Sequence, residues 1–329
     1  MTGSATPDKL PNPRQAYIAR INRVMDHIDT HLADALDLNT LAAVAHFSPW
    51  HFHRVFQAMT GETLADCVRR RRLEAAAQRL LQSPPLPALQ VALELGFASA
   101  EVFSRTFKAH FAMTPTAWRR GGWRDWVAQQ QAALSKIHQG LHKAHQAAAA
   151  AFRDNPRHWP SGPVATKRGL TMHIEIQTLA PQRLAYLRYT GPYGSPDITQ
   201  TWGRFAAWCA AHGLMEPRRT MYGLSLDNPA ITAPDKCRYD CCVVVDEEFK
   251  AQGEIGVQTH PGGRYACAHF SGTATDIHAA WMHLYGDWLA NSPWQADDKP
   301  NLEIYPVDFV MDPVSGAFSC LLCVPVKPL

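Results

Sequence analysis

Apolar side chains recur every three or four positions through residues 13–124, which is the period of an amphipathic helix. The first such face consists of Ile18, Ile21, Met25, Ile28 and Leu32. Shorter helices are predicted at residues 38–46, 49–59, 63–82, 87–95, 100–111 and 115–124. Several begin with a hydroxyl residue before a proline, or three positions before an acid, and both arrangements are helix-start signals. This part of the chain is therefore predicted to be entirely helical.

The pattern changes beyond about residue 171, where β-branched and aromatic runs alternate with single helices. An offset of 81 residues superposes Arg183 on Arg264 and Gly191 on Gly272, which indicates a duplication. Each copy reads strand, helix, strand, strand, at residues 183–190, 198–212, 219–226 and 239–246, then 264–271, 276–290, 302–307 and 317–326. We expect an α+β domain in which both helices cover one face of a joint sheet and an apolar pocket lies on the opposite, concave face.

The helical region is duplicated as well. An offset of 51 residues superposes Phe52 on Phe103, Arg54 on Arg105 and Phe56 on Phe107. Each copy has a short supporting helix, a tight turn and a second helix with two distinct faces, which is the pattern of a helix-turn-helix unit. A plain helical bundle with solvated polar faces is the alternative for one copy, and the matched Phe–Arg–Phe spacing in two copies argues against it.

The second helix of each unit is predicted to pack through one face and to meet DNA through the other. The packing residues are Phe52, Phe56 and Met59 in the first unit, and Phe103, Phe107 and Phe111 in the second. The opposite faces present Trp50, His53, Arg54 and Gln57, and Glu101, Arg105 and Lys108. Such groups can bond to bases or press on a thymine methyl. The long helix between the units, with arginines at 69–72, would hold the two readers at a fixed separation, so that one chain reads two successive major grooves.

The distribution of charge supports a polyanionic partner. The net charge is only +3, but residues 49–125 hold 11 Lys and Arg against 6 Asp and Glu, whereas residues 126–329 hold 17 against 18. No apolar run approaches the ~18–20 residues of a membrane helix. The first 13 residues lack the apolar segment of a signal peptide. We therefore expect a cytoplasmic, multi-domain protein with no membrane contact.

Cysteine and histidine spacings predict neither a disulfide framework nor a metal site. Cys320 and Cys323 form a Cys-x-x-Cys within an apolar strand, where positions i and i+3 point to opposite faces. We interpret the eight cysteines as buried thiols. His138, His142 and His145 share a face of the predicted connector helix without an accompanying cysteine or carboxylate, which favours a solvated surface. No metal and no cofactor are predicted.

Three segments resemble the AraC/XylS family of bacterial regulators: LAAVAHFSPWHFHRVFQAMTGET, RRRRLEAAAQRLL and ALELGFASAEVFSRTFKAHFAMTPTAWRR. The resemblance covers about residues 14–122 and implies double-stranded DNA as the partner. It places base and phosphate contacts on Trp50, His53, Arg54, Gln57, Ser99, Ala100, Glu101, Arg105 and Lys108. Two departures are notable. His46 occupies a turn position where glycine is usual, and Ala100 and Glu101 replace amides, so that Glu101 could accept a hydrogen bond from cytosine or repel phosphate.

Residues 171–329 resemble the GyrI-like effector-binding domain through YLRYTGPY, YGLSLDNP, RYDCCVVVD and LEIYPVD. The order of the two domains resembles the Rob-like arrangement. The resemblance implies a small-molecule effector, often aromatic and cationic, and places the pocket carboxylate on Glu303. Plausible walls of that pocket are Trp202, Tyr222, Tyr239 and Tyr305.

Two other functions are weighed against transcription regulation. Some GyrI-like domains hydrolyse small compounds, but no second acid beside Glu303, nucleophile elbow or metal set is found here. A gyrase inhibitor would leave the helix-turn-helix pair without a role, whereas contact with RNA polymerase is compatible with regulation. We predict a non-enzymatic, sequence-specific, ligand-responsive regulator. Its expected parts are a tail (1–12), a DNA-binding domain (13–124), a helical connector and linker (125–170) and an effector-binding domain (171–329).

Overall fold

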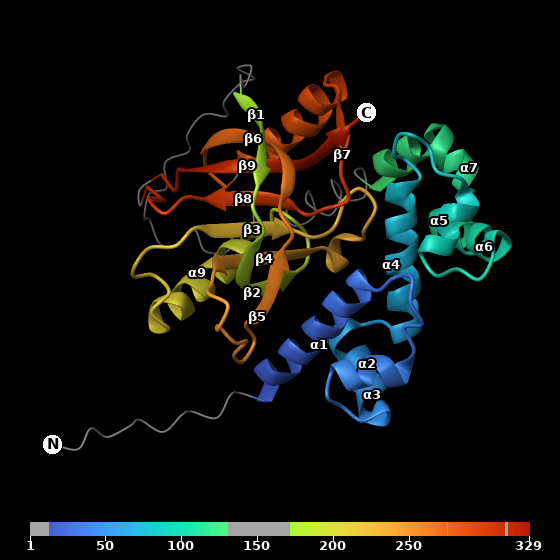
Figure 1. Ribbon diagram of the computed structural model, residues 1–329, viewed down its shortest axis with the longest axis horizontal. Helices are drawn as coiled ribbons and strands as arrows, with labels where there is room; N and C mark the ends of the chain where they lie inside the picture. Colours follow the sequence, from blue (N-terminus) through green and yellow to red (C-terminus); the bar gives the residue numbers. More distant parts are fainter. Residues whose placement is uncertain (1–12, 131–171, 275, 313–314) are drawn as a thin grey trace, which may run out of the picture.

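The computed structural model describes residues 13–130, 172–274, 276–312 and 315–329. The predicted fold class is confirmed, because an all-helical region is followed by an α+β domain (Figure 1). In the described ranges, no helix has the length and apolar character needed to cross a membrane. The helical elements are α1 (Pro13–Thr30), α2 (Leu38–Val44), α3 (Pro49–Thr60), α4 (Leu64–Arg79), α5 (Ala88–Glu94), α6 (Ala100–Phe111), α7 (Pro115–Ala117) and the π-helical turn η1 (Trp118–Gly122).

The predicted helix starts form for the expected reasons. The Thr63 hydroxyl accepts from the Asp66 backbone N–H and donates to its carboxylate, which caps α4. The Thr114 hydroxyl caps α7 by accepting from the Ala117 backbone N–H, with Pro115 as the first helical residue. Ser48 differs, because its side chain makes no cap bond and the start of α3 relies on the proline that follows.

The two helix-turn-helix turns reach the same backbone conformation with different residues. His46 has a φ of 53° and Gly96, at the matching position of the second unit, has a φ of 72°. A Cβ on Gly96 would lie 2.7 Å from the Arg72 guanidinium and 2.9 Å from the Leu32 carbonyl oxygen. The second turn therefore needs glycine for close approach as well as for its dihedral angle.

Each unit packs on its own phenylalanines. Phe52 and Phe56 are buried in the first unit, and Phe103, Phe107 and Phe111 in the second, as predicted. Met59, in the last turn of α3, is predicted to join the first set but is 39% exposed and lies outside the cluster in which Phe52 and Phe56 pack. The two buried clusters include opposite halves of α4, which runs from one unit to the other (Figure 1).

The strands of the second domain form one antiparallel sheet. In the described residues its order is β1-β6-β9-β8-β3-β4-β2-β5, with β7 pairing to β9. The elements are β1 (Ile174–Leu179), β2 (Gln182–Thr190), α9 (Pro196–Ala211), β3 (Met221–Ser225), η2 (Pro234–Lys236), β4 (Arg238–Val244), β5 (Gly256–His260), β6 (Gly263–Gly272), α10 (Ile277–His283), η3 (Leu284–Trp288), η4 (Leu289–Asn291), β7 (Trp294–Ala296), β8 (Asn301–Tyr305) and β9 (Phe318–Pro328).

The predicted duplication is visible in the strand order. The two copies meet where β3 pairs with β8, and each copy continues outward through two further strands. Strands β1, β5 and β7 were not predicted. Strand β1 precedes the first copy but pairs with β6 of the second, and β5 precedes the second copy but pairs with β2 of the first. The copies therefore exchange their leading strands.

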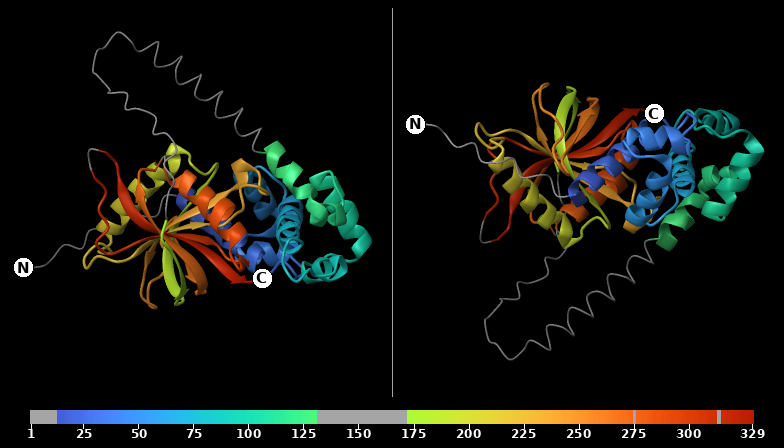
Figure 2. Two further views of the ribbon diagram at one scale, coloured as in Figure 1. Left: turned by 90° about the horizontal axis from the view of Figure 1, so that it is seen from above. Right: turned by 90° about the horizontal axis from the view of Figure 1, so that it is seen from below.

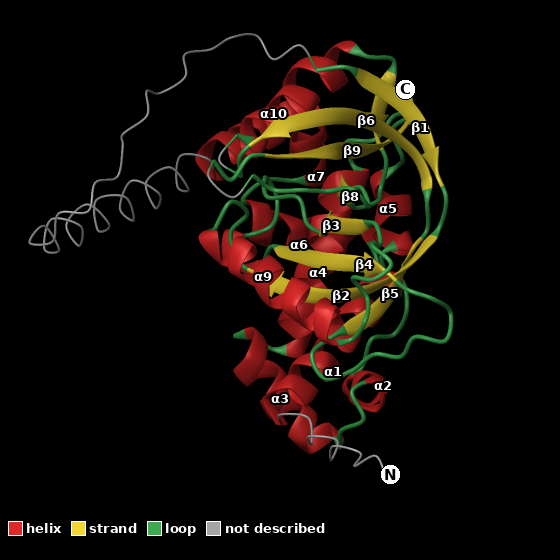
Figure 3. Cartoon of the chain, turned by 90° about the vertical axis from the view of Figure 1, so that its left-hand side faces the viewer, coloured by secondary structure: helices red, strands yellow, loops and turns green. Residues whose placement is uncertain are grey.

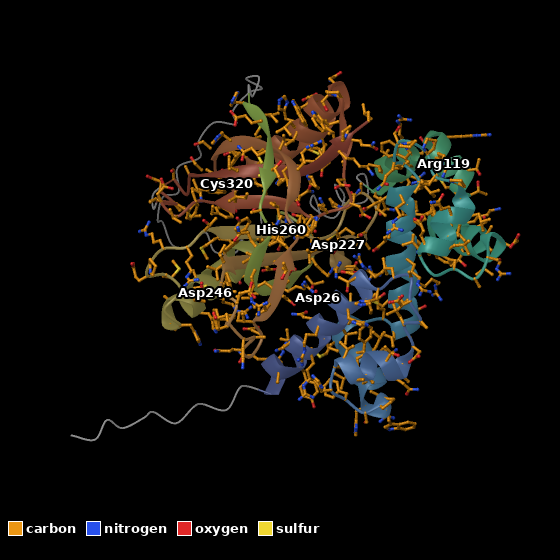
Figure 4. The ribbon with its side chains drawn as sticks, in the orientation of Figure 1. Asp26, Arg119, Asp227, Asp246, His260 and Cys320 are labelled. Carbon is orange, nitrogen blue, oxygen red and sulfur yellow. The ribbon has the colours of Figure 1, made fainter. Side chains whose placement is uncertain are left out.

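Helices α9 and α10 lie on the same side of the sheet, as expected (Figure 3). The opposite face carries a separate buried cluster that includes Tyr186, Tyr222 and Tyr265. On that side α1 contacts β2 and β5, as the dark blue helix beside the strands in Figure 2 shows, and α4 contacts the loop after β3 through Arg71 and Asp227. Asp26 in α1 and Asp227 after β3 lie at this boundary (Figure 4).

Candidate functional site: a DNA-reading surface and a buried carboxylate

The predicted reading face of α3 is open to solvent. Trp50 is 75% exposed, and His53, Arg54 and Gln57 are exposed beside it. The Arg54 guanidinium carbon lies 5.8 Å from the centroid of the Trp50 ring. Buried Phe52 and Phe56 anchor the opposite side of the helix. The face is therefore free to contact a partner without disturbing the core.

The corresponding helix of the second unit, α6, presents a smaller polar face. Glu101, Arg105 and Lys108 are exposed, whereas Ser99 and Ala100 are half-buried. Ser99 is the N-cap of α6 and accepts a hydrogen bond from the Val102 backbone N–H at 3.3 Å. The Ser99 side chain also hydrogen-bonds Glu101 and lowers the pKa of its carboxyl group. Glu101 is therefore anionic near neutral pH, which suits acceptance from cytosine and disfavours proximity to phosphate.

Arg70, Arg71 and Arg72, in the middle of α4, do not add to this surface, which corrects the simple view of a basic patch at 49–125. Arg70 bonds Glu62 at 2.7 Å, Arg71 pairs with Asp29 at 2.8 Å, and Arg72 donates to three backbone carbonyl groups. Their charges are neutralised or used inside the protein, because acidic partners from distant segments converge on α4.

In the sheet domain, a buried carboxylate is surrounded by aromatic hydrogen-bond donors. The hydroxyl groups of Tyr239 and Tyr305 donate to Glu303 Oε2 at 2.5 Å and 2.8 Å. The Trp281 indole N–H donates to Glu303 Oε1 at 3.4 Å. The Trp202 indole N–H donates to the Tyr239 hydroxyl oxygen at 3.3 Å. Glu303, Tyr239, Tyr305, Trp202 and Trp281 are called the Glu303 site below.

Strand register and one glycine bring this site together. Glu303 and Tyr305 come from β8, Tyr239 from β4, and the intervening strand β3 places Gly223 opposite Glu303. A Cβ on Gly223 would lie 1.9 Å from the Tyr239 hydroxyl oxygen. The tyrosine therefore reaches the carboxylate across β3 only because that position has no side chain.

The environment of Glu303 differs from that of the other buried carboxylates. Among the described residues, the buried acids are Glu74, Asp227, Asp240 and Glu303. Glu74, Asp227 and Asp240 are ion-paired with arginine. The hydrogen-bond donors to Glu303 are neutral. Burial raises the pKa of Glu303 above its ordinary value, and the bonds from Tyr239, Tyr305 and Trp281 only partly oppose that effect.

The structure corrects two expectations about this site. The Glu303 site lies on the sheet face that α9 and α10 cover, between the helices, and not on the opposite face, because Trp202 and Trp281 project from those helices. Tyr222 packs into the cluster on the other face, because neighbouring residues of a strand alternate in direction and Gly223 faces Glu303. The prediction that Tyr222 forms a wall of the pocket around Glu303 is therefore wrong.

Sequence reasoning missed Trp281 as a member of the site. A usable signal existed, because each duplicated copy has a tryptophan within the first two turns of its single helix. Trp202 and Trp281 are those residues. Each copy thus contributes one indole N–H to the site: Trp281 donates to Glu303, and Trp202 donates to Tyr239, which in turn donates to Glu303.

The cysteines behave as buried thiols, as predicted. All eight are free and buried, and Cys320 and Cys323 belong to clusters on opposite faces of the sheet. Within the described ranges, no group of three or more His, Cys, Asp or Glu side chains is arranged to hold a metal ion. His138, His142 and His145 lie outside those ranges.

Comparison with known families identifies both regions of the chain. A helix-turn-helix domain family matches residues 41–121, and a GyrI-like small molecule binding domain family matches residues 172–327. Regulatory protein SoxS of Salmonella typhimurium is 33% identical over 99 residues, which are 30% of this chain and 92% of SoxS. Probable transcription factor PqrA of Proteus vulgaris is 36% identical over 104 residues, which are 31% of this chain and 84% of PqrA.

A solved structure is also similar to the helical region. The DNA-binding domain of AdpA, crystallised with a target DNA, is 30% identical and covers 31% of this chain and 90% of its own, with a TM-score of 0.29. Two helix-turn-helix units followed by a small-molecule-binding sheet domain define a DNA-binding, ligand-responsive transcription regulator. The chain belongs to the AraC/XylS family of transcriptional regulators and carries a C-terminal GyrI-like domain.

Proposed function

We propose that α3 and α6 read two adjacent major grooves of an operator. Four side chains on α3, Trp50, His53, Arg54 and Gln57, supply contacts to bases and phosphates in one groove. On α6, Glu101, Arg105 and Lys108 contact the second, with Ser99 and Ala100 at the start of the helix. The exposure of these faces and the burial of the phenylalanines behind them support this assignment. Such a regulator acts in the cytoplasm, where contact with RNA polymerase is compatible with its role.

Selection of random duplexes with the full chain tests this assignment. The expected product is a motif of two blocks about one helical turn, ~34 Å, apart. Recovery of a single block would restrict base reading to one unit, and recovery of no motif would contradict sequence-specific reading.

We further propose that the Glu303 site binds an aromatic organic cation. The observation that carries this proposal is the environment of Glu303. Among the described residues, the hydrogen-bond donors to this buried acid are all neutral, whereas the other buried acids are paired with arginine. A buried carboxylate without a positive partner is costly. An aromatic cation supplies the missing charge and stacks on the tryptophan and tyrosine rings around it. Each exposed cation–π contact contributes only about 0.5–1 kcal/mol, so charge pairing with Glu303 dominates the discrimination.

A matched pair of probes separates charge from shape. Phenyltrimethylammonium and tert-butylbenzene have nearly the same size and differ by one positive charge. Tryptophan fluorescence of the full chain reports binding of each, because Trp202 and Trp281 belong to the site. Glu303→Gln should weaken the cation strongly and spare the neutral probe, whereas Glu247→Gln, at an exposed acid, should change neither. Equal losses for both probes would make Glu303 a structural residue.

Hydrolysis is the alternative chemistry for this site. A buried Glu with a raised pKa is a possible general base. We favour binding because the site is joined to two DNA-reading units, for which catalysis has no evident use. Turnover of p-nitrophenyl acetate by the full chain that is lost in Glu303→Gln and retained in Glu247→Gln would favour a hydrolase instead.

A further inference from the structure

The loop between β3 and β4 joins the Glu303 site directly to the helical domain. This loop, residues 226–237, connects two strands that both line the site, since Gly223 lies on β3 and Tyr239 on β4. Gly223 is three positions before the loop and Tyr239 is two positions after it. A displacement of either strand at the site is therefore passed to the loop through very few covalent bonds.

The loop reaches both helix-turn-helix units. Ile231 is 6% exposed and belongs to the buried cluster of the second unit, together with Phe103 and Phe107 of its reading helix. The Lys236 ammonium group donates to the Thr60 carbonyl oxygen at 2.6 Å. Thr60 is the last residue of α3, so the lysine charge lies at the negative end of the first reading helix.

The base of the loop is closed by bonds between its two ends, made by charged and hydroxyl groups. Arg238 donates to both carboxylate oxygens of Asp227 at 2.9 Å. The Tyr193 hydroxyl donates to the carbonyl oxygen of Arg238 at 2.7 Å and accepts from the Asp227 backbone N–H at 3.1 Å. Within the loop, the Asn228 carbonyl oxygen accepts from the backbone N–H groups of Ile231 and Thr232. These bonds make the loop stiff, so that a displacement at its base is transmitted along it.

We propose that the β3–β4 loop transmits occupancy of the Glu303 site to both reading helices. This inference rests on the proposed function only in requiring an occupant that competes for Glu303. A cation at the carboxylate competes with the Tyr239 hydroxyl group, which then gives up or lengthens its 2.5 Å bond. Tyr239 is adjacent to Arg238, so the change acts on the closed base of the loop. Ile231 and Lys236 carry it to the second and the first unit, and the relative positions of α3 and α6 change.

A double-mutant cycle tests this path without any ligand. Tyr239→Phe removes the bond to Glu303 at one end of the path, and Lys236→Met removes the bond to α3 at the other. Lys327→Met is the matched control, because Lys327 also reaches from the sheet domain to the helical domain, where its ammonium group bonds Gln82 at 3.1 Å, but it lies outside the loop. Affinity of each full-length variant for the selected operator is measured.

Coupled residues give non-additive effects, whereas independent ones give additive effects. The factor by which Tyr239→Phe changes operator affinity should differ by about threefold or more between the Lys236→Met and unmodified backgrounds. It should be the same in the Lys327→Met and unmodified backgrounds. Ile231→Val, a mild change inside the same core, should also alter the factor. Equal factors in all backgrounds, or no effect of Tyr239→Phe on operator affinity, overturn the proposal.

A second arm with phenyltrimethylammonium separates this proposal from the ligand assignment. Because coupling is reciprocal, the factor by which the probe changes operator affinity equals the factor by which the operator changes probe affinity. In Lys236→Met, the probe should change operator affinity less, and the operator should change probe affinity less, so both factors approach one. The probe affinity measured by fluorescence without DNA should stay unchanged. Failure of the probe to bind would reject the cation assignment, and the ligand-free cycle would still decide whether the loop couples the two regions.

Discussion

Arg71 of α4 and Asp227, in the loop between β3 and β4, form an ion pair of 2.5 Å that joins the helical domain to the sheet domain. The pair belongs to a closed ring, because Arg71 also bonds Asp29 of α1 at 2.8 Å and Arg238 bonds both Asp29 and Asp227. Burial tends to raise the pKa of Asp29 and of Asp227, but the two arginines outweigh it and lower both pKa values. The orientation of the two domains is therefore fixed by these ion pairs, because separating the domains would leave their charges without partners.

Replacement of Asp227 by Asn should be strongly destabilising. It leaves Arg71 and Arg238 facing each other with one acid fewer, and loss of one partner from a buried pair costs about 3–5 kcal/mol. Asp246→Asn is the control, since that carboxylate is 71% exposed and its pair with Arg219 should contribute about 0–1 kcal/mol. Thermal or urea unfolding of both variants measures the difference. Similar small losses would show that the ring contributes little.

The same ring predicts a loss of stability in acid. Both aspartates have folded-state pKa values below their ordinary values, so their contribution is present above the unfolded value of about 3.9 and declines as pH falls below it. The urea midpoint should drop through this range more steeply for the unmodified chain than for Asp227→Asn. The two curves should therefore converge in acid, and parallel curves would contradict the assignment.

The exposure of α3 predicts how two of its residues respond to truncation. Arg54→Ala should lose about 1–3 kcal/mol of operator binding and relax one block of the motif. Trp50→Ala should also weaken binding but leave the melting temperature almost unchanged, because its side chain is mostly in solvent. Phe52→Ala, on the buried face, should lower the melting temperature sharply. A large drop for Trp50→Ala would mean that this ring has a structural role.

Glu303→Gln should stabilise the protein near neutral pH. The raised pKa means that the unmodified chain is less stable once pH rises through the folded value, because the folded state then holds a buried charge. The amide oxygen can still accept from the two tyrosines, and removal of such a functional cost commonly gains about 0.5–2 kcal/mol. The melting temperature of Glu303→Gln is compared with that of Glu247→Gln. A lower melting temperature would indicate a purely structural carboxylate.

Cation binding should depend on pH in a way that neutral binding does not. Only the ionised carboxylate pairs with phenyltrimethylammonium, and the raised pKa of Glu303 places its protonation above the ordinary Glu value of about 4.3. Affinity for the cation should therefore fall as pH decreases toward that value, starting earlier than for an exposed Glu. The affinity for tert-butylbenzene should remain flat, and a shared decline would point to unfolding of the site.

Periodicity was sufficient to predict much of the fold, and its failures have physical causes. The spacing of Phe103, Phe107 and Phe111 predicted a buried face because a helical repeat fixes which side chains share a side. Strand β1 was missed because its mixed burial gives a weak pattern, although the 81-residue offset maps it onto β5. Comparing short segments at this 81-residue offset would have indicated both β1 and β5.

The site was harder to predict because it depends on contacts between distant segments. Alternation along β3 separates Tyr222 from Gly223, but it does not say which face the helices cover. Arg71 looked like a surface charge because its partners Asp29 and Asp227 are 42 and 156 residues away. Long-range pairing of charges leaves no local signal in one sequence.

The exchange of β1 and β5 makes the two halves of the sheet topologically dependent on each other. A cut between β4 and β5 yields two pieces, each of which carries the edge strand of the other and lacks its own. Either piece alone exposes unpaired backbone groups on β2 or β6, a state that favours pairing with another chain. Mixed together, the pieces regain every strand neighbour described here. The sheet domain therefore has the connectivity of a strand-swapped dimer whose two subunits are joined in a single chain.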